Sequence, residues 1–427
     1  MPFIEVATYK NGRPYSSECF NCYSGVRIAK IGDVTNKRDI TSWEFVDNDE
    51  FYNQAGDLLT TGDILMTLTG DPPDIGKVNY IYNPVNASWN QRVAKVCLTN
   101  EQSIYINNDV LYAILSTETV RIQLERYAKG IRQRNLGNES LERLLLPVIS
   151  KDMQLYIKAC IEEAYALYSS SMVRYKEAEE SILLNELQFV DWQPSIDTHS
   201  EKMLSNSFVK SGRLDAEYYQ PKYDELTNLV KSHQSGYDKL EKLFLIKDRN
   251  YIPESDCLYK YIELSNIGFD GSITGYTEAL GEDLPSRARR IVRSGDLIVS
   301  SLEGSLNSCA IIPEKYDGAI CSTGFYVLTP KDVNVETALV LFKSQLMQAL
   351  MTRVCSGSIM AGMNTDEFAN LIVPKIDQHT QHVIAEIIQD CAKKREDSIN
   401  LLELAKTAVE IAIEQGEDKA MELLTTK

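Results

Sequence analysis

The sequence predicts an α+β fold in which two similar mixed α/β modules are each followed by a long helix. The first observation is an internal repeat at an offset of about 230 residues. KIGDV in residues 30–34 recurs as ELSNI in residues 263–267, and GDILM in residues 62–66 recurs as GDLIV in residues 295–299. A repeat this long indicates a duplicated domain, because solenoid units span only 20–50 residues. The second observation is a long helical stretch after each copy, at residues 151–187 and 377–424.

The parallel continues to the end of each copy. Residues 111–116 align with 339–344, and residues 141–147 align with 368–374, so that both copies close on a proline, Pro147 and Pro374. We therefore divide the chain into a first module (1–150), a first helix (151–190), a second module (191–376) and a second helix (377–427). The duplication implies a pseudo-two-fold relation between the two halves.

Short strands and one helix are expected in the first module. Segments rich in β-branched and aromatic residues and bounded by Gly, Pro, Asn or Asp predict strands at 27–31, 64–68, 78–82 and 93–98. An apolar side formed by Val110, Ala113, Ile114, Val120 and Leu124 predicts one helix over residues 108–127. A Gly- and Asn-rich loop, residues 130–138, follows it.

The second module repeats this order. Strands are expected at 259–264, 296–300, 310–312 and 324–328, a helix at 335–351 and a loop at 356–364. A leader, RLDAEYYQPKY in residues 213–223, and a following helix precede this module. At the repeat offset, the equivalent leader of the first module would lie before Met1.

Each long helix carries an apolar stripe with spacings of three, four and seven, as in helices that pack on helices. The stripes are Ile157, Ile161, Ala164, Tyr168, Tyr175, Ala178 and Ile182 in the first helix, and Ile384, Ile388, Cys391, Ile399, Leu402, Ala405, Val409 and Ile413 in the second. Rods of about 50–60 Å are expected at 1.5 Å per residue. Two such rods would lie antiparallel as a coiled-coil spacer that holds the modules apart; the alternative is an ordinary helical hairpin in a core.

Composition excludes several classes of protein. No run of 18 apolar residues predicts a membrane span, and the first residues lack the basic and apolar regions of a signal peptide. Nine scattered cysteines suit a reducing cytosol, so a cytoplasmic location is expected. The net charge of −17 disfavours nucleic acid, but nearly half of it lies in the two helical segments. A DNA contact requires a local basic patch rather than a basic protein.

The motifs that could carry catalysis are weak. DPPD in residues 71–74 resembles the Asp-Pro-Pro-aromatic tetrapeptide of amino-group DNA methyltransferases, but Asp74 replaces the aromatic residue, and a turn is the better interpretation. Cys19 and Cys22 form only half of a zinc site, and the four histidines form no Ser–His–Asp or Cys–His set. We therefore predict no catalytic residue, no cofactor and no metal.

Basic side chains gather in three loops of this acidic chain. They are Lys37 and Arg38; Arg126, Lys129, Arg132 and Arg134, beside Asn135; and Arg287, Arg289, Arg290 and Arg293 in the second module. Cations of this kind bind phosphates, and amides such as that of Asn135 can read base edges. For any one cluster the alternative is a solvated run of charge. Clusters in both modules favour DNA binding.

With this layout the chain resembles the specificity subunit of type I restriction–modification systems. The module-to-helix junctions LLLP (144–147) and LIVP (371–374), the leader DAEYY (215–219) and the tail AVEIA (408–412) carry the resemblance. It implies two target-recognition domains that each read half of a bipartite, asymmetric site in double-stranded DNA. It also implies two partner methylation subunits that use S-adenosylmethionine, and restriction subunits beyond them.

Two other functions fit parts of the sequence. An acidic decoy that sequesters methylation subunits would keep the helices and lose the basic loops, which this chain retains. An orphan nuclease or methyltransferase would carry catalytic motifs that are not recognisable here; such a methyltransferase would protect DNA alone with S-adenosylmethionine.

Overall fold

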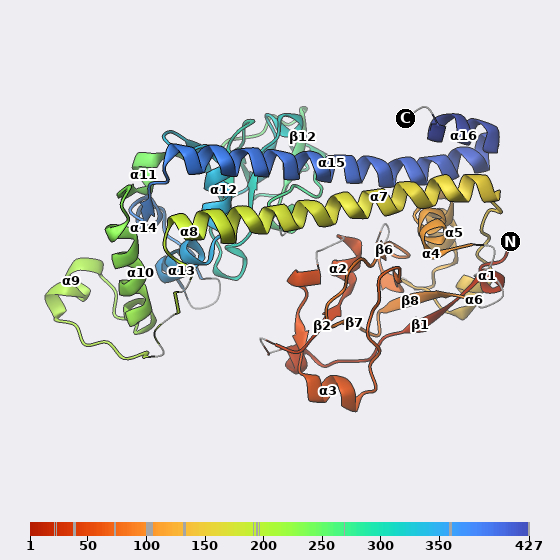
Figure 1. Cartoon of the computed structure of the whole chain (residues 1–427), viewed down its shortest axis with the longest axis horizontal. Coiled ribbons are helices and arrows are strands. Elements are labelled where there is room, and N and C mark those ends of the chain that lie inside the picture. Colours follow the sequence, from red (N-terminus) through yellow and green to blue (C-terminus); the bar gives the residue numbers. More distant parts are fainter. Residues whose placement is uncertain are drawn as a thin grey trace. The chain divides into compact units, whose positions relative to one another are not determined.

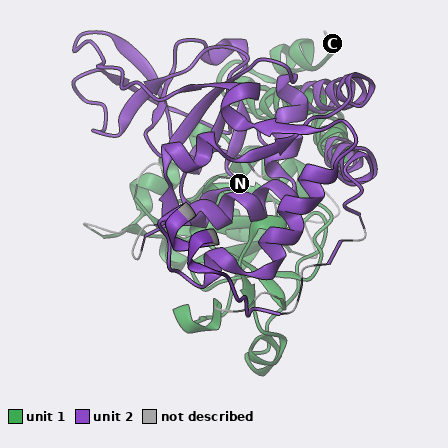
Figure 2. Cartoon of the chain, turned by 90° about the vertical axis from the view of Figure 1, so that its left-hand side faces the viewer, with its two compact units in different colours: residues 1–169, 394–427 green, residues 170–393 purple. Residues whose placement is uncertain are grey.

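The chain folds into two compact units, which Figure 2 distinguishes by colour: Met1–Ser169 with Lys394–Lys427, and Ser170–Lys393. The computed structural model describes the chain except for residues 21, 23, 37–39, 72–73, 100–105, 131–133, 191, 194, 196, 269, 358–360 and 426–427, and the side chains of 206 and 210. The boundary between the units falls within two long helices, α7 (Lys151–Lys176) and α15 (Gln378–Gln415), which are labelled in Figure 1.

Unit 1 contains two main sheets. The larger is antiparallel, in the order β1 (Ala7–Asn11), β8 (Val93–Leu98), β4 (Ile64–Thr67), β6 (Val78–Tyr80). The smaller has the order β3 (Phe45–Val46), β2 (Val26–Ala29), β7 (Ala87–Trp89), in which β2 and β7 are parallel. A third pair joins β5 (Thr69–Gly70) to β9 (Arg134–Asn135). The four strands predicted from the sequence are therefore confirmed, except that β2 ends at Ala29 and β6 at Tyr80.

The predicted helix over residues 108–127 is wrong in one respect: it is two helices, α4 (Asn108–Leu115) and α5 (Glu118–Tyr127). The break follows from Thr117, which adopts an extended backbone and accepts the Val120 N–H through its side chain, as an N-cap does. Both helices pack on the larger sheet in one hydrophobic cluster. The remaining short helices are α1 (Phe3–Val6), α2 (Ile31–Thr35), α3 (Asn48–Asn53) and α6 (Asn138–Glu142).

Unit 2 has the same strand order as unit 1 in the strands that the two units share. Its antiparallel sheet runs β11 (Phe244–Lys247), β18 (Phe325–Pro330), β15 (Leu297–Ser300), β16 (Cys309–Ile311). Its second sheet runs β13 (Thr277–Leu280), β12 (Leu258–Ile262), β17 (Ile320–Ser322), β14 (Ala288–Ile291), with β12 and β17 parallel. Two short pairs are β10 (Tyr237–Lys239) with β21 (Ile372–Pro374), and β19 (Cys355–Ser356) with β20 (Gly362–Met363).

The helix predicted over residues 335–351 is also interrupted. It forms α12 (Val335–Lys343) and α13 (Gln345–Val354), and Ser344 caps the second as Thr117 caps α5. Unit 2 adds an amphipathic helix after the leader, α10 (Pro221–Ser232), whose Tyr223, Leu226 and Val230 are buried. The shorter helices are α9 (Phe208–Ser211), α11 (Leu240–Leu243) and α14 (Thr365–Ala369).

The repeated Gly-Asp turn proves to be structural. Gly62 and Gly295 have positive φ values of 93° and 82°, which glycine adopts without steric cost. The buried Asp63 accepts the Thr60 N–H at 2.8 Å and lies 3.1 Å from the Lys95 Nζ atom. Asp296 likewise accepts the Arg293 N–H at 2.8 Å and binds Lys247 Nζ at 2.8 Å. Each aspartate therefore closes the turn that starts a central strand.

The long helices differ from the prediction in three places. The helix of residues 151–187 has a π-helical segment at Glu177–Leu183 before α8 (Leu184–Glu186). The second helix breaks at Gly416, where φ is 95°, and resumes as α16 (Glu417–Thr425). The predicted stripe is wrong at Ile399 and Ile413, which are 59% and 37% exposed. Ala405 and Val409 are buried as predicted, and residues 398, 401 and 408, which the predicted stripe omits, are buried beside them because they continue the 3.6-residue period.

Each unit includes parts of both long helices in its core. In unit 1, Ile157, Ile161 and Ala164 belong to the same hydrophobic cluster as Ala405 and Val409. In unit 2, Tyr175 and Ala178 belong to one cluster with Ile384, Ile388 and Cys391. The stripes therefore bury apolar surface within each unit, as their spacing predicts.

Candidate nucleic-acid interface

In the predicted basic loop of unit 1, the described residues on either side of 131–133 pair as two short strands. Lys129 and Asn135 exchange both backbone hydrogen bonds, at 3.0 and 2.8 Å. Arg134 and Asn135 form β9, which pairs with Thr69 and Gly70 directly after strand β4. The Asn135 side chain also accepts a hydrogen bond from the Thr69 hydroxyl at 2.8 Å. The structure thus brings Lys129, Arg134 and Asn135 together at one edge of the unit.

The basic side chains of this hairpin differ in their contacts. Lys129 forms an exposed ion pair with Glu139, and Arg134 donates through Nη1 to the Glu125 carbonyl at 3.2 Å. Arg126 is exposed in the last turn of α5, and the described residues give its guanidinium no ion pair or hydrogen bond. Lys37, Arg38 and Arg132, which we also expected at the interface, lie outside the described residues.

The arginines of unit 2 occupy strand β14 and its ends. Arg287 precedes the strand and is exposed, and its carbonyl accepts the Thr323 N–H at 2.8 Å. Arg289 is half-buried and donates through Nε to the Ser286 carbonyl at 3.1 Å. Arg290 has a buried Nη1 atom without a hydrogen-bond partner among the described residues. Arg293 lies 3.3 Å from the Asp317 carboxylate in an exposed ion pair. Arg287 is therefore the most accessible of the four for an external anion.

The turn Asn90–Gln91–Arg92 was not expected at this interface. The Arg92 carbonyl accepts the Leu68 N–H at 3.0 Å, and the Leu68 carbonyl accepts the Leu136 N–H at 2.8 Å. The turn thereby lies beside the β9 hairpin, although more than 40 residues separate them in sequence. An amide and an arginine between two strands, at residues 91 and 92, are the sequence signal that could have identified it.

The cysteines and the DPPD segment that the sequence analysis considered make local contacts in the structure. In the part of the chain that the structure describes, no three His, Cys, Asp or Glu side chains are placed to hold a metal ion. The Cys22 thiol donates to the Phe45 carbonyl at 3.2 Å, and Cys19 contacts the Ser16 hydroxyl at 3.3 Å. Asp74 pairs with Lys77 at 2.9 Å, while residues 72 and 73 of the DPPD segment lie outside the described residues.

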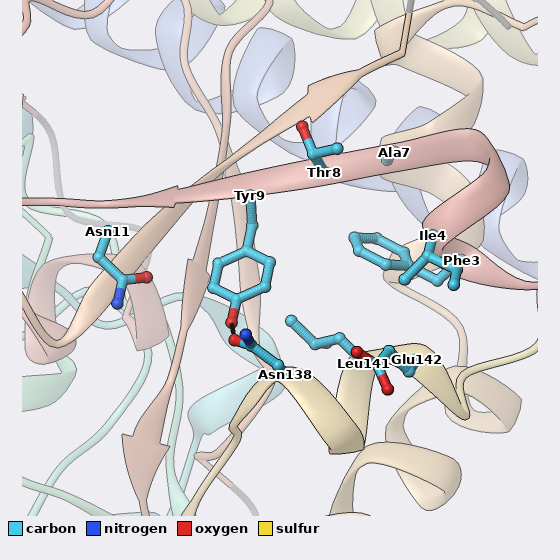
Figure 3. A pocket seen from close by; sticks show the side chains of 9 residues that line it. All are labelled: Phe3, Ile4, Ala7, Thr8, Tyr9, Asn11, Asn138, Leu141 and Glu142. Carbon is cyan, nitrogen blue, oxygen red and sulfur yellow. Dashed lines mark hydrogen bonds between the residues drawn. The ribbon is translucent and has the colours of Figure 1, made fainter.

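One hollow of about 420 Å³ lies between β1 and α6 in unit 1 (Figure 3). Its lining is mostly apolar and amide side chains with the single carboxylate of Glu142. The Tyr9 hydroxyl donates to the Asn138 side chain across it, as the dashed line in Figure 3 marks. This bond links the edge strand β1 to the start of α6. The Tyr9–Asn138 hydrogen bond therefore helps to fix the end of the loop that carries Arg134.

The chain matches one protein family. Residues 238–403 match the type I restriction modification DNA specificity domain. Comparison with curated proteins gives no match. Among the described residues no helix is long and apolar enough to cross a membrane.

Several solved structures are similar to the chain. An HsdS subunit from Thermoanaerobacter tengcongensis is 23% identical over 42% of this chain and 46% of its own length, with a TM-score of 0.32. A type I restriction-modification system S subunit from M. genitalium is 12% identical over 99% and 95% of the two chains, with a TM-score of 0.39. A chain from a type I R-M system structure, solved to explain complex assembly and conformational transition, is 12% identical over 97% of both chains, with a TM-score of 0.31.

Proposed function

We propose, from the match of residues 238–403 to the type I restriction modification DNA specificity domain, that this chain is the DNA specificity subunit of a type I restriction–modification complex. The observation that carries this proposal beyond the matched domain is the duplication. Unit 1 lies largely outside the matched residues, yet it repeats the strand order of unit 2. We infer that both units are target-recognition domains.

Two related but different recognition domains imply a bipartite and asymmetric site in double-stranded DNA. In unit 1 the proposed DNA-binding residues are Lys37, Arg38, Arg126, Lys129, Arg132, Arg134 and Asn135; in unit 2 they are Arg287, Arg289, Arg290 and Arg293. Arg126 and Arg287 support this assignment, because both are exposed and have no carboxylate partner among the described residues, which leaves them free to neutralise phosphates. Because the two units present different side chains, their half-sites are expected to differ in sequence.

In this proposal α7 and α15 form the spacer between the recognition domains and dock two methylation subunits, beyond which restriction subunits assemble. Leu155, Val173 and Ile399, each more than half exposed on these helices, are the apolar side chains that we assign to docking. The chain itself is proposed to be non-catalytic and cytoplasmic, with S-adenosylmethionine bound by the methylation subunits. The reaction would therefore be carried out by the partners at the position that this chain selects.

Methylation mapping tests the function directly. The chain is co-expressed with methylation subunits in cells that lack adenine methylation, and modified positions are read by long-read sequencing. The expected result is one asymmetric motif of two half-sites separated by unread base pairs, and none when this chain is left out. Methylation by the chain without partners would instead support an orphan methyltransferase. Assembly with the methylation subunits that abolishes their DNA binding would support a decoy.

A further inference from the structure

Three segments of unit 1 that are distant in sequence lie side by side at one edge. They are the turn at residues 90–92, the end of β4 at residues 67–69 and the β9 segment at residues 134–136. The Arg92 carbonyl accepts the Leu68 N–H at 3.0 Å, and the Leu68 carbonyl accepts the Leu136 N–H at 2.8 Å. A surface that contacts residues 134 and 135 is therefore continuous with residues 91 and 92.

The turn is held on both sides. The Asn90 side chain accepts the Arg92 N–H at 3.0 Å, and the Gln91 N–H donates to the Arg13 carbonyl at 3.0 Å. Arg13 is fixed in turn, because its Nε and Nη2 atoms donate to the Ala55 carbonyl at 3.3 and 3.1 Å. A backbone fixed in this way presents its side chains at little entropic cost when a ligand binds.

Gln91 and Arg92 are both exposed, and the described residues give neither side chain an ion pair or hydrogen bond. Other basic side chains nearby already contact protein groups: Lys129 pairs with Glu139, Lys77 pairs with Asp74, and Arg134 donates to the Glu125 carbonyl. A solvated turn is the ordinary explanation for one exposed arginine. The internal repeat provides the second observation that favours a ligand.

In unit 2 the corresponding turn contains Thr323 and Gly324 and has no basic side chain. It makes the same contacts: the Gly324 carbonyl accepts the Ser301 N–H, and the Ser301 carbonyl accepts the Met363 N–H, both at 2.8 Å. There Arg287 adjoins the turn, since its carbonyl accepts the Thr323 N–H at 2.8 Å. Each unit thus places one exposed arginine at the same edge, and the two arginines come from different segments.

We propose that Gln91 and Arg92 form a second DNA-reading element of unit 1, beside the β9 hairpin; this inference rests on the proposed function. Gln91 reads a base edge in the major groove, where its amide matches the paired donor and acceptor of adenine. Arg92 binds a phosphate of the same half-site. The corresponding turn of unit 2 has Thr323 at the position of Gln91, so this edge is a source of the difference in sequence between the two half-sites.

The test uses the full chain assembled with methylation subunits and a pool of randomised DNA duplexes, from which bound sequences are selected. Gln91→Ala is expected to lose discrimination at one position of one half-site, roughly tenfold or more, and to leave the other half-site unchanged. Arg92→Ala is expected to weaken binding of the selected duplex about tenfold and to lower the slope of log affinity against log salt by roughly one. Arg92→Lys should restore most of the affinity, because a phosphate contact requires only a cation.

Arg121→Ala is the matched control, since Arg121 lies in the same unit but is paired with Glu118 and Glu125 on α5. All variants are first compared by thermal unfolding; the exposed positions of Gln91 and Arg92 predict unchanged midpoints. The inference is overturned if Gln91→Ala selects the wild-type motif and Arg92→Ala has the affinity and salt slope of Arg121→Ala. Failure of the wild-type assembly to select any motif would overturn the proposed function itself, which is a separate result.

Discussion

At the scale of single residues, the same side chain serves different purposes in the two units. Arg353 of unit 2 donates to the Tyr218 carbonyl at 3.2 Å and to the Thr227 hydroxyl at 3.1 Å, so it fixes the leader. Its equivalent by the repeat is Arg126, which is exposed and has no ion pair or side-chain hydrogen bond among the described residues. Arg126 is therefore free for an external anion, whereas Arg353 is not.

Glu179, in the π-helical segment, predicts a pH dependence of stability. Burial raises the pKa of Glu179 to about 7 from an ordinary value of 4.5. The folded state then holds a proton that the unfolded state releases, so its stabilising effect is complete below pH 4.5 and is lost as pH rises towards 7. Glu179→Gln should remove this loss and stabilise the protein at pH 8 by on the order of 2 kcal/mol relative to the wild type.

Urea unfolding at pH 5 and pH 8 measures this difference. Glu180→Gln is the control, because Glu180 is adjacent and exposed. Equal stability differences for the two variants between the two pH values would refute the role of Glu179.

At the scale of elements, helix α10 accounts for a systematic difference between the repeated helices. Leu346 and Leu350 of α13 are 1% and 2% exposed and belong to one hydrophobic cluster with Leu226 and Val230 of α10. The equivalent residues of α5 are Thr119 and Gln123, which are polar. Gln123 instead exchanges hydrogen bonds with the Leu145 backbone at 3.0 and 3.1 Å. The face that α10 covers in unit 2 is thus polar in unit 1.

Truncating both positions should therefore give unequal losses of stability. Leu350→Ala removes buried apolar contacts and is expected to destabilise unit 2 by about 3 kcal/mol. Gln123→Ala removes partly exposed hydrogen bonds and should cost about 1 kcal/mol. Chemical unfolding followed by far-UV circular dichroism compares the two variants, and losses of similar size would show that α10 does not cover Leu350 as we infer.

Much of the fold could be predicted from local patterns, and the exceptions have physical causes. Strand β8 was predicted at residues 93–98 because its period and borders are local. The breaks at Thr117 and Ser344 were not predicted, since an N-cap inside an apolar stretch is a weak signal against strong periodicity. The sequence predicts Ile399 to be buried, but it is exposed. A seven-residue spacing rotates slowly around a helix with 3.6 residues per turn, so residues chosen by that spacing drift off the buried face.

The candidate site was predictable only where its residues are close in sequence. Lys129, Arg134 and Asn135 form one hairpin, so a single loop indicated all three. Arg92 reaches the same edge through the Leu68 backbone, which only tertiary structure brings there. The sequence predicts Arg290 to bind DNA together with three neighbouring arginines. In a strand, however, successive side chains point to opposite faces, and the Nη1 atom of Arg290 is buried.

At the scale of the whole molecule, the proposed function implies that the lengths of α7 and α15 set the spacing between the two DNA half-sites. Helix α15 contains 38 residues, which is about 57 Å at 1.5 Å per residue. The Cys391 thiol donates to the Ser171 carbonyl at 3.2 Å, so α7 and α15 are in contact within unit 2. A change in the length of both helices should then change the number of unread base pairs between the half-sites.

Inserting four residues after Ala164 in α7 and four after Asp397 in α15 lengthens each helix by about 6 Å. The unread gap is expected to grow by one or two base pairs at about 3.4 Å each, with both half-site sequences unchanged. Methylation mapping measures the gap, and four substitutions to Ala on the exposed face of α7 provide the control. A folded variant that methylates with the original gap would exclude this role of the two helices.

The discontinuity of unit 1 has a consequence for synthesis on the ribosome. Unit 2 is one uninterrupted segment, Ser170–Lys393, and its whole core has been translated before the final 34 residues emerge. Unit 1 begins the chain but needs Leu401, Ala405, Ala408 and Val409 to complete its core. The module that is synthesised first is therefore the one whose core is completed last. A chain that ends before residue 401 would therefore carry a first module whose hydrophobic core lacks the side chains that α15 supplies.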